Sequence, residues 1–167
     1  MDYISSRGQS PAVDSAQAVL SGLAPDGGLY MPRAIPAFDW QHCLTLSAQQ
    51  MSAAILSALL PDIPNMEALV KRAYTGKFET EDLTPTVPVG DFQVLELFRG
   101  PTSAFKDVAL SMLPQLLTAA KQEKGIAQEI RILTATSGDT GKAALVGFQD
   151  VPGVSICVFY PFGGVSQ

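Results

Sequence analysis

The stretch Gly100-Pro101-Thr102-Ser103-Ala104-Phe105-Lys106-Asp107 places one lysine where a turn becomes a helix. Gly100 and Pro101 interrupt the preceding apolar run, and Thr102 or Ser103 can cap the free amides of a helix that continues in the apolar pattern of residues 108–120. We therefore expect Lys106 in the first helical turn. There the positive end of the helix dipole repels an ammonium group, which makes a merely structural cation unfavourable. On position alone, a surface lysine and a reactive amine both remain open.

A second polar turn, Thr136-Ser137-Gly138-Asp139-Thr140-Gly141, follows about thirty residues later. It lies between a predicted strand at 129–135 and a predicted helix at 141–148, and an apolar strand at 154–160 comes next. Strand, helix and strand form one β-α-β unit with two parallel strands and a right-handed crossover. Ligands bind at the carboxyl ends of such strands, so the turn is a candidate site for a carboxylate or phosphate. Alternatively, Asp139 or Thr140 simply caps the helix.

The elements around these turns predict an α/β fold. The apolar stripe after the lysine predicts a helix over 103–124, which Pro114 either bends or divides into two. The near-continuous apolar character of residues 154–160 indicates a strand with both faces covered.

The first half of the chain carries no chemical cluster. Residues 3–8 look extended, a helix is expected from Ser10-Pro11 to Gly22, and residues 29–31 form a short strand after a tight turn. Apolar residues at helical spacing predict two further helices over 47–60 and 65–74. Two prolines and a glycine within residues 83–90 suggest a boundary, which gives a small helical N-terminal domain at 1–88 and the start of a mostly parallel sheet with flanking helices at 89–167.

Composition excludes several classes of function. The net charge is −5, the sequence pI is about 4.7, and no cluster of basic residues is present, so a nucleic-acid partner is not expected. The longest apolar runs fall short of a membrane span and the start lacks a signal peptide, which makes a cytoplasmic location the default expectation. His42 is the only histidine, and Cys43 and Cys157 have no metal-type spacing. We expect neither a metal site nor a disulfide.

Four strings, in this order, resemble the motifs of threonine synthases, which belong to the fold-type II family of pyridoxal-phosphate enzymes. They are Ser5-Ser6-Arg7-Gly8, the string from Gly22 to Pro32, the Lys106 stretch and the Thr136–Gly141 turn. The resemblance covers essentially the whole chain, but the chain covers well under half of such an enzyme. Arg7 and Asp26, within the first two strings, are read either as a substrate pair or as parts of a solvated loop.

The resemblance implies a cofactor and a substrate. Lys106 would hold pyridoxal 5'-phosphate as a Schiff base, and the freed amine would then move the α- and β-protons of O-phospho-L-homoserine. Thr136, Ser137, Gly138, Asp139 and Thr140 would bind the α-carboxylate of the substrate. Phosphate would leave the γ-carbon and water would add at the β-carbon, giving L-threonine. Asp107 belongs to the motif and is expected to cap the helix.

The resemblance also implies an incomplete catalytic domain. The loop for the cofactor phosphate and the residue that meets the pyridine nitrogen lie downstream of Gly163-Gly164-Val165-Ser166-Gln167, and Phe162 replaces a usual Lys or Arg. We expect a fragment that is inactive and retains the cofactor poorly by itself, and that self-associates through an open sheet edge. The alternatives are another fold-type II lyase or dehydratase acting on serine or threonine, and a non-catalytic binding module.

Overall fold

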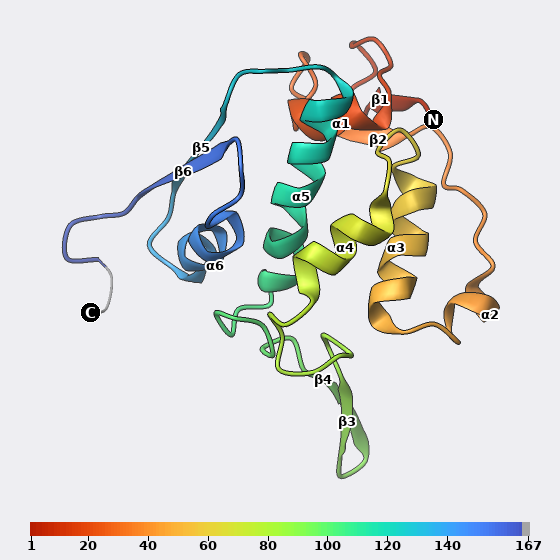
Figure 1. Ribbon diagram of the computed structural model, residues 1–167, viewed down its shortest axis with the longest axis vertical. Coiled ribbons are helices and arrows are strands. Elements are labelled where there is room, and N and C mark those ends of the chain that lie inside the picture. Colours follow the sequence, from red (N-terminus) through yellow and green to blue (C-terminus); the bar gives the residue numbers. More distant parts are fainter. Residues whose placement is uncertain (165–167) are drawn as a thin grey trace. The chain divides into compact units, whose positions relative to one another are not determined.

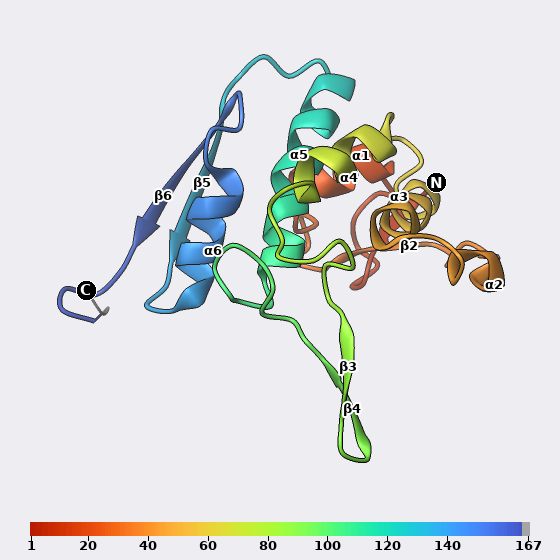
Figure 2. The same ribbon diagram turned by 60° about the horizontal axis from the view of Figure 1, so that its bottom comes forward.

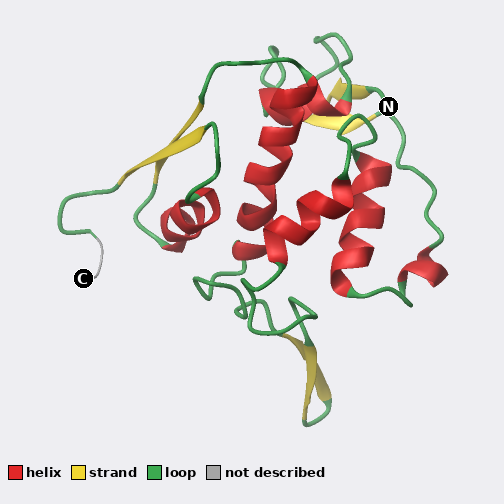
Figure 3. Cartoon of the chain, viewed as in Figure 1, coloured by secondary structure: helices red, strands yellow, loops and turns green. Residues whose placement is uncertain are grey.

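The computed structural model describes residues 1–164, which form two compact units. One unit consists of Met1–Val70 and Leu116–Ala127, and the other of Lys71–Gln115 and Gln128–Gln167. Both units use part of helix α5 (Asp107–Glu123), which runs unbroken through Pro114 (Figure 3). The alternative in which Pro114 divides this helix is therefore wrong. Residue 88 lies within a strand, and the division into domains 1–88 and 89–167 stays a prediction.

The first unit combines a strand pair with short helices (Figure 1). Its elements are β1 (Tyr3–Ser5), α1 (Ser15–Ser21), β2 (Tyr30–Pro32), α2 (Trp40–Cys43), α3 (Ala48–Leu59) and the first part of α4 (Met66–Tyr74), with β1 and β2 antiparallel. Helix α1 begins later than expected, because Asp14 rather than Ser10 supplies the N-cap; it ends at Gly22 as predicted. A capping box of Ser47 and Gln50 starts α3 at its predicted place. Helix α2 was not foreseen.

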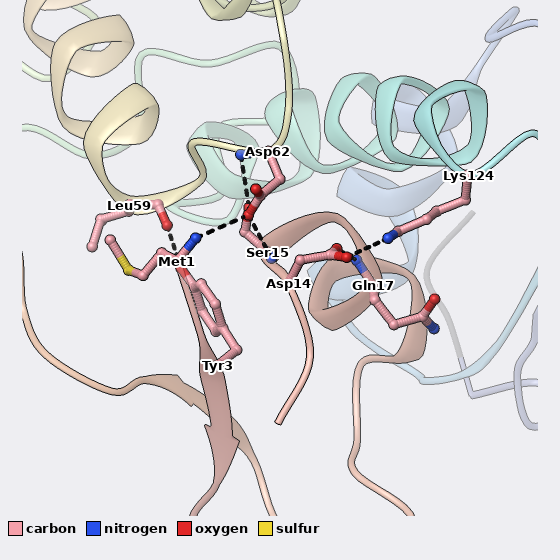
Figure 4. A network of polar contacts seen from close by, with 8 residues as sticks. All are labelled: Met1, Tyr3, Asp14, Ser15, Gln17, Leu59, Asp62 and Lys124. Carbon is pink, nitrogen blue, oxygen red and sulfur yellow. Dashed lines mark hydrogen bonds and ion pairs between the residues drawn. The ribbon is translucent and has the colours of Figure 1, made fainter. Parts of the chain in front are cut away.

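Polar contacts fasten α1 within this unit (Figure 4). Asp62 accepts hydrogen bonds from the amide of Ser15 at 3.1 Å and from its hydroxyl at 2.8 Å. Asp14 accepts one from the amide of Gln17 at 2.8 Å and pairs with Lys124, the residue that follows α5. The hydrogen bond from Lys124, followed by that from Gln17, lowers the pKa of Asp14. One carboxylate thus caps α1 and joins it to the C-terminal end of α5.

The second unit contains a hairpin and a β-α-β unit (Figure 2). The hairpin pairs β3 (Thr86–Val89) with β4 (Phe92–Leu95), and the β-α-β unit comprises β5 (Ile130–Ala135), α6 (Asp139–Phe148) and β6 (Val154–Phe159). Strands β5 and β6 are parallel, with Ile130 opposite Val154 and Ala135 opposite Phe159, as predicted. The segment expected as a linker forms β3 instead, because Gly90 at φ +58° permits a tight turn back into β4.

The expectation that both faces of the last strand are covered is wrong for the described residues. Strand β5 alternates between half-buried and exposed positions, and Leu133 and Phe159 are 64% and 58% exposed. Helix α6 follows β5 and packs beside the strand pair (Figure 2). A parallel sheet needs helices on both faces, and one helix can cover only one of them.

Helices α5 and α6 approach each other closely at Gly147. A Cβ added there would lie 2.1 Å from the carbonyl oxygen of Leu110 and 2.8 Å from its carbonyl carbon. Ala143, Ala144 and Phe148 on α6 are buried. The absence of a side chain at position 147 therefore allows the backbones of two helices to come together, and this packing holds α6 in the second unit.

Candidate active site

Lys106 is the residue immediately before α5. The expectation that it lies in the first helical turn is therefore wrong. Its carbonyl accepts the hydrogen bond from the amide of Leu110 at 2.8 Å, which makes Lys106 the N-cap residue. The expected capping by Thr102 or Ser103 is wrong, because the hydroxyl of Thr102 donates to Asp107 instead. Lys106 therefore lies at the junction between a loop and a helix.

Asp107 shapes the loop before the lysine. Its carboxylate accepts hydrogen bonds from the amide of Thr102 at 2.8 Å and from the hydroxyl of Thr102 at 2.6 Å. The expectation that Asp107 caps α5 is therefore wrong: the side chain points back into the loop, and the residue is only 2% exposed. Gly100 leaves room for it, since a Cβ there would lie 2.5 Å from Oδ2 of Asp107. Ser103, at φ +60°, makes the sharp bend between the bonded residues.

The amine of Lys106 faces the second polar turn. Its Nζ lies 4.0 Å from Oδ2 of Asp139 and 4.5 Å from the ring centre of Phe105. The lysine side chain is 30% exposed, so the amine is partly shielded and still accessible. Because Asp139 is well exposed, water screens the attraction between the two charges. The structure thus brings together two motifs that are separated by an entire helix and strand in the sequence.

The second turn leaves the start of α6 without a side-chain cap. Gly138 is the N-cap residue, and no side chain accepts from the amides that follow it, so the expected capping by Asp139 or Thr140 is wrong. Thr136 accepts a hydrogen bond from the amide of Gly138 at 3.3 Å. Gly141 brings the helix close to the strands, since a Cβ there would lie 2.7 Å from Cγ2 of Thr136. Amides at such a helix start suit an anion.

A pocket of about 430 Å³ opens at this turn. Four of the predicted substrate residues line it, namely Thr136, Ser137, Gly138 and Asp139, whereas Thr140 is not among its lining residues. Sequence reasoning missed the other lining residues, Gly141, Lys142, Leu145, Val158 and Tyr160. The helical spacing of 138, 141, 142 and 145 could have found the first three, because these positions share one helix face.

Arg7 and Asp26 are in contact, but their side chains do not form an ion pair with each other. Nη1 of Arg7 donates to the backbone carbonyl of Asp26 at 2.9 Å. The carboxylate of Asp26 accepts from the hydroxyl of Ser5 at 2.7 Å and from the amides of Gln9 and Gly28, each at 2.9 Å. These contacts, led by Ser5, lower the pKa of Asp26 to about 2. The carboxylate therefore organises its own loop.

Other sequence-based expectations concern features outside this pocket. Among residues 1–164, no group of side chains is suited to hold a metal ion, and no helix is long and apolar enough to cross a membrane. Cys43 and Cys157 are free thiols. Phe162 is fully exposed, while Val165, Ser166 and Gln167 lie outside the described residues.

The fold and the pocket define an α/β protein in which a lysine faces a polar turn at the carboxyl end of a parallel strand. Residues 2–74 match the family described as the threonine synthase N terminus. Along its length the chain is 37% identical to a threonine synthase of Methylobacillus glycogenes and 38% identical to one of Saccharomyces cerevisiae. The alignments cover 100% and 98% of this chain, but 38% and 36% of those enzymes.

Solved structures give the same result. The crystal structure of a threonine synthase with bound pyridoxal phosphate from Brucella melitensis matches 99% of this chain at a TM-score of 0.90 and 38% identity, and the yeast threonine synthase matches 99% at 0.88 and 36% identity. The chain spans 37% and 36% of those structures. The resemblance to the threonine synthase family is thereby confirmed, and the chain corresponds to the N-terminal portion of its members.

Proposed function

We propose that this chain forms the front of a threonine synthase, which converts O-phospho-L-homoserine and water into L-threonine and phosphate. The observation that carries this proposal is the distance of 4.0 Å between Nζ of Lys106 and the carboxylate of Asp139, at the edge of a pocket lined by the second turn. Similarity to threonine synthases along the whole chain supports it.

The residues of this chain fit one part of a pyridoxal-phosphate site. The amine of Lys106 is partly exposed, as required of a group that bonds to an aldehyde, and lies 4.0 Å from Asp139, which lines the pocket. The uncapped start of α6, with Thr136, Ser137, Gly138, Asp139 and Thr140, supplies amides and hydroxyls for the α-carboxylate of an amino-acid substrate. When bound, the cofactor supplies an electron sink for the carbanions of the reaction.

Lys106 has two tasks in this proposal. Its Nζ would hold the cofactor. Once released by the incoming substrate amine, it would accept the proton from the α-carbon, give it up again, and as a neutral amine accept a proton from the β-carbon. The bond between the γ-carbon and the phosphate oxygen breaks, water adds at the β-carbon, and the protons return to the product. The second turn keeps the carboxylate fixed, so that the α-carbon stays within reach of Nζ.

The test uses the complete product of the gene, purified with added pyridoxal phosphate. We expect the visible absorbance of lysine-bound cofactor, together with release of phosphate and L-threonine from O-phospho-L-homoserine. Lys106→Ala should abolish both, whereas Lys71→Ala, which replaces an exposed lysine of α4, should change neither. Turnover of serine or threonine in place of O-phospho-L-homoserine would instead identify a lyase or dehydratase, and a folded protein without cofactor would identify a binding module.

The isolated chain of 167 residues has its own expected properties. We propose that it retains the cofactor poorly and lacks activity, because Lys106 and the second turn make up only part of the pocket. We also propose that it self-associates through its exposed apolar strand pair. The cytoplasmic location expected from the sequence is likewise a proposal, which fractionation of cells tests.

A further inference from the structure

Hydrogen bonds between Thr102 and Asp107 close the loop that carries Lys106. Thr102 and Asp107 are joined twice, through the amide and the hydroxyl of Thr102, and Lys106 lies between them. The distances of 2.6 and 2.8 Å are those of well-formed hydrogen bonds. We call this pair of hydrogen bonds the Thr102–Asp107 clamp.

Burial gives the clamp its strength. The residue Asp107 is 2% exposed and Thr102 is 8% exposed, so water competes weakly for either partner. A buried carboxylate without hydrogen bonds is costly, and therefore the loop can open only if Asp107 is rehydrated or left unpaired. Gly100 supports the same arrangement, because a side chain there would occupy the place of the Asp107 carboxylate.

The clamp fixes the backbone from which the Lys106 side chain projects. Asp107 is the first residue of α5, and its amide donates to the carbonyl of Ala104 at 3.0 Å. The carbonyl of Lys106 accepts from Leu110 at 2.8 Å. The backbone of Lys106 is thus held by the helix on one side and by the clamp on the other, which leaves only the side-chain torsions free.

We propose that Asp107 is a positioning residue, which acts through Thr102 to aim the amine of Lys106 at the second turn. This inference rests on the assignment of Lys106 as the cofactor lysine. The carboxylate points back into the loop and is held there by Thr102, so it acts on Lys106 through the backbone. Loss of the clamp allows the loop to relax, and a displacement of about 1 Å at a reacting group lowers rates by as much as 100-fold.

The experiment compares four variants of the complete gene product. Asp107→Asn keeps the size of the side chain but replaces an acceptor with a donor, and Thr102→Val keeps the shape but removes the hydroxyl donor. Thr102→Ser retains both bonds and serves as the conservative rescue. Met112→Val changes a buried residue further along α5 and serves as the control for general loss of stability.

The first readout is independent of the cofactor. Lysine amines are modified with formaldehyde and a borohydride in cofactor-free protein, and the rate and pH profile at Lys106 are compared with those at Lys142 by peptide mass spectrometry. We expect Asp107→Asn and Thr102→Val to change the Lys106 rate several-fold relative to Lys142, while Thr102→Ser and Met112→Val leave that ratio unchanged. The second readout is steady-state kinetics, in which kcat should fall about 10- to 100-fold with little change in KM.

Two results would overturn the inference. One is an unchanged Lys106 rate in folded Asp107→Asn and Thr102→Val protein. The other is an equal change in Met112→Val, which would mean that the amine responds only to overall stability. If the Lys106 rate changes as expected but unaltered protein binds no pyridoxal phosphate, the positioning by Asp107 stands and the proposed threonine synthase function fails.

Discussion

At the level of single residues, several carboxylates have structural tasks that their sequence positions do not reveal. Asp107, expected as a helix cap, bonds backwards to Thr102, and Asp26, considered as a substrate partner of Arg7, bonds to Ser5 and to backbone amides. The donor to Asp107 lies five residues before it, but the direction of that side chain depends on backbone angles such as φ +60° at Ser103. Ser5 and Gln9, which donate to Asp26, lie 21 and 17 residues before it, so the sequence near Asp26 does not reveal them.

Acid should weaken the loop that Asp26 organises. The pKa of Asp26 is lowered to about 2 in the folded protein, and an unfolded aspartate titrates near 3.9. The stabilisation is therefore present above about pH 4 and is lost as the pH falls towards about 2. We expect urea unfolding of Asp26→Asn to show a smaller loss of stability across this range than the unaltered protein. Equal pH dependence of the two proteins would contradict this, and Asp91→Asn, at the hairpin turn, is the control.

At the level of elements, long periodic segments were predicted well and junctions were not. Helices α3, α4 and α6 and strands β5 and β6 lie close to their predicted ranges, because apolar spacing directly reports which face is buried. The starts of α1 and α5 were placed too early. Pro11 and Ser103 suggested helix starts, but Asp14 is the N-cap residue of α1 and Lys106 is that of α5. Strand β3 was missed because it contains a proline and lies in a segment whose prolines and glycine are typical of a linker.

Alanine at position 147 should disturb the packing of α5 against α6. A Cβ at Gly147 would lie 2.1 Å from the carbonyl oxygen of Leu110, and backbone atoms cannot move aside as a flexible side chain can. We expect Gly147→Ala to reduce the free energy of unfolding by about 1–3 kcal/mol in urea titrations. Gly138→Ala, at the start of the same helix, meets no atom within 4 Å and should have a much smaller effect. Equal stability of the two variants would argue against this close contact.

The ion pair at the start of α1 should be separable from the helix cap. Asp14→Asn keeps an oxygen that can accept from Gln17, whereas Asp14→Ala removes the cap as well as the pair with Lys124. We expect Asp14→Asn and Lys124→Met to cost similar amounts, up to about 1 kcal/mol, because both charged side chains are partly exposed. Asp14→Ala should cost about 1 kcal/mol more in thermal or urea unfolding. No difference between Asp14→Ala and Asp14→Asn would mean that the cap contributes nothing.

At the level of the whole molecule, the open face of the β5–β6 pair should govern self-association. Leu133 and Phe159 are more than half exposed, and single-sided strand pairs of this kind offer both apolar surface and an unpaired edge. We expect light scattering to show concentration-dependent association of the isolated chain, and Leu133→Thr to reduce it. Arg131→Lys, on the same strand, should leave it unchanged. A monomer at all concentrations would rule out this surface as the cause.

The residues of the two motifs at the candidate site were predicted, but the residues that surround them were not. Lys106 and the second turn were identified as partners, since a lysine at a helix entrance and a polar turn after a strand each have a chemical meaning. Lys142, Leu145 and Tyr160 were missed, although they line the same pocket. Lys142 and Leu145 share a helix face with the turn, so their spacing could have revealed them. Tyr160 has a type that is ordinary for a strand end, and only the placement of α6 against β6 makes it a neighbour of the turn.

The division of α5 between the two units constrains how the protein is made. Residues 1–70 leave the ribosome well before Leu116–Ala127, the segment that completes their unit and carries Lys124. The nascent chain must therefore hold α1 without the partner of Asp14 until α5 has emerged. A polypeptide cut at residue 74, where the family match ends, would lack this segment permanently and with it the pair between Asp14 and Lys124.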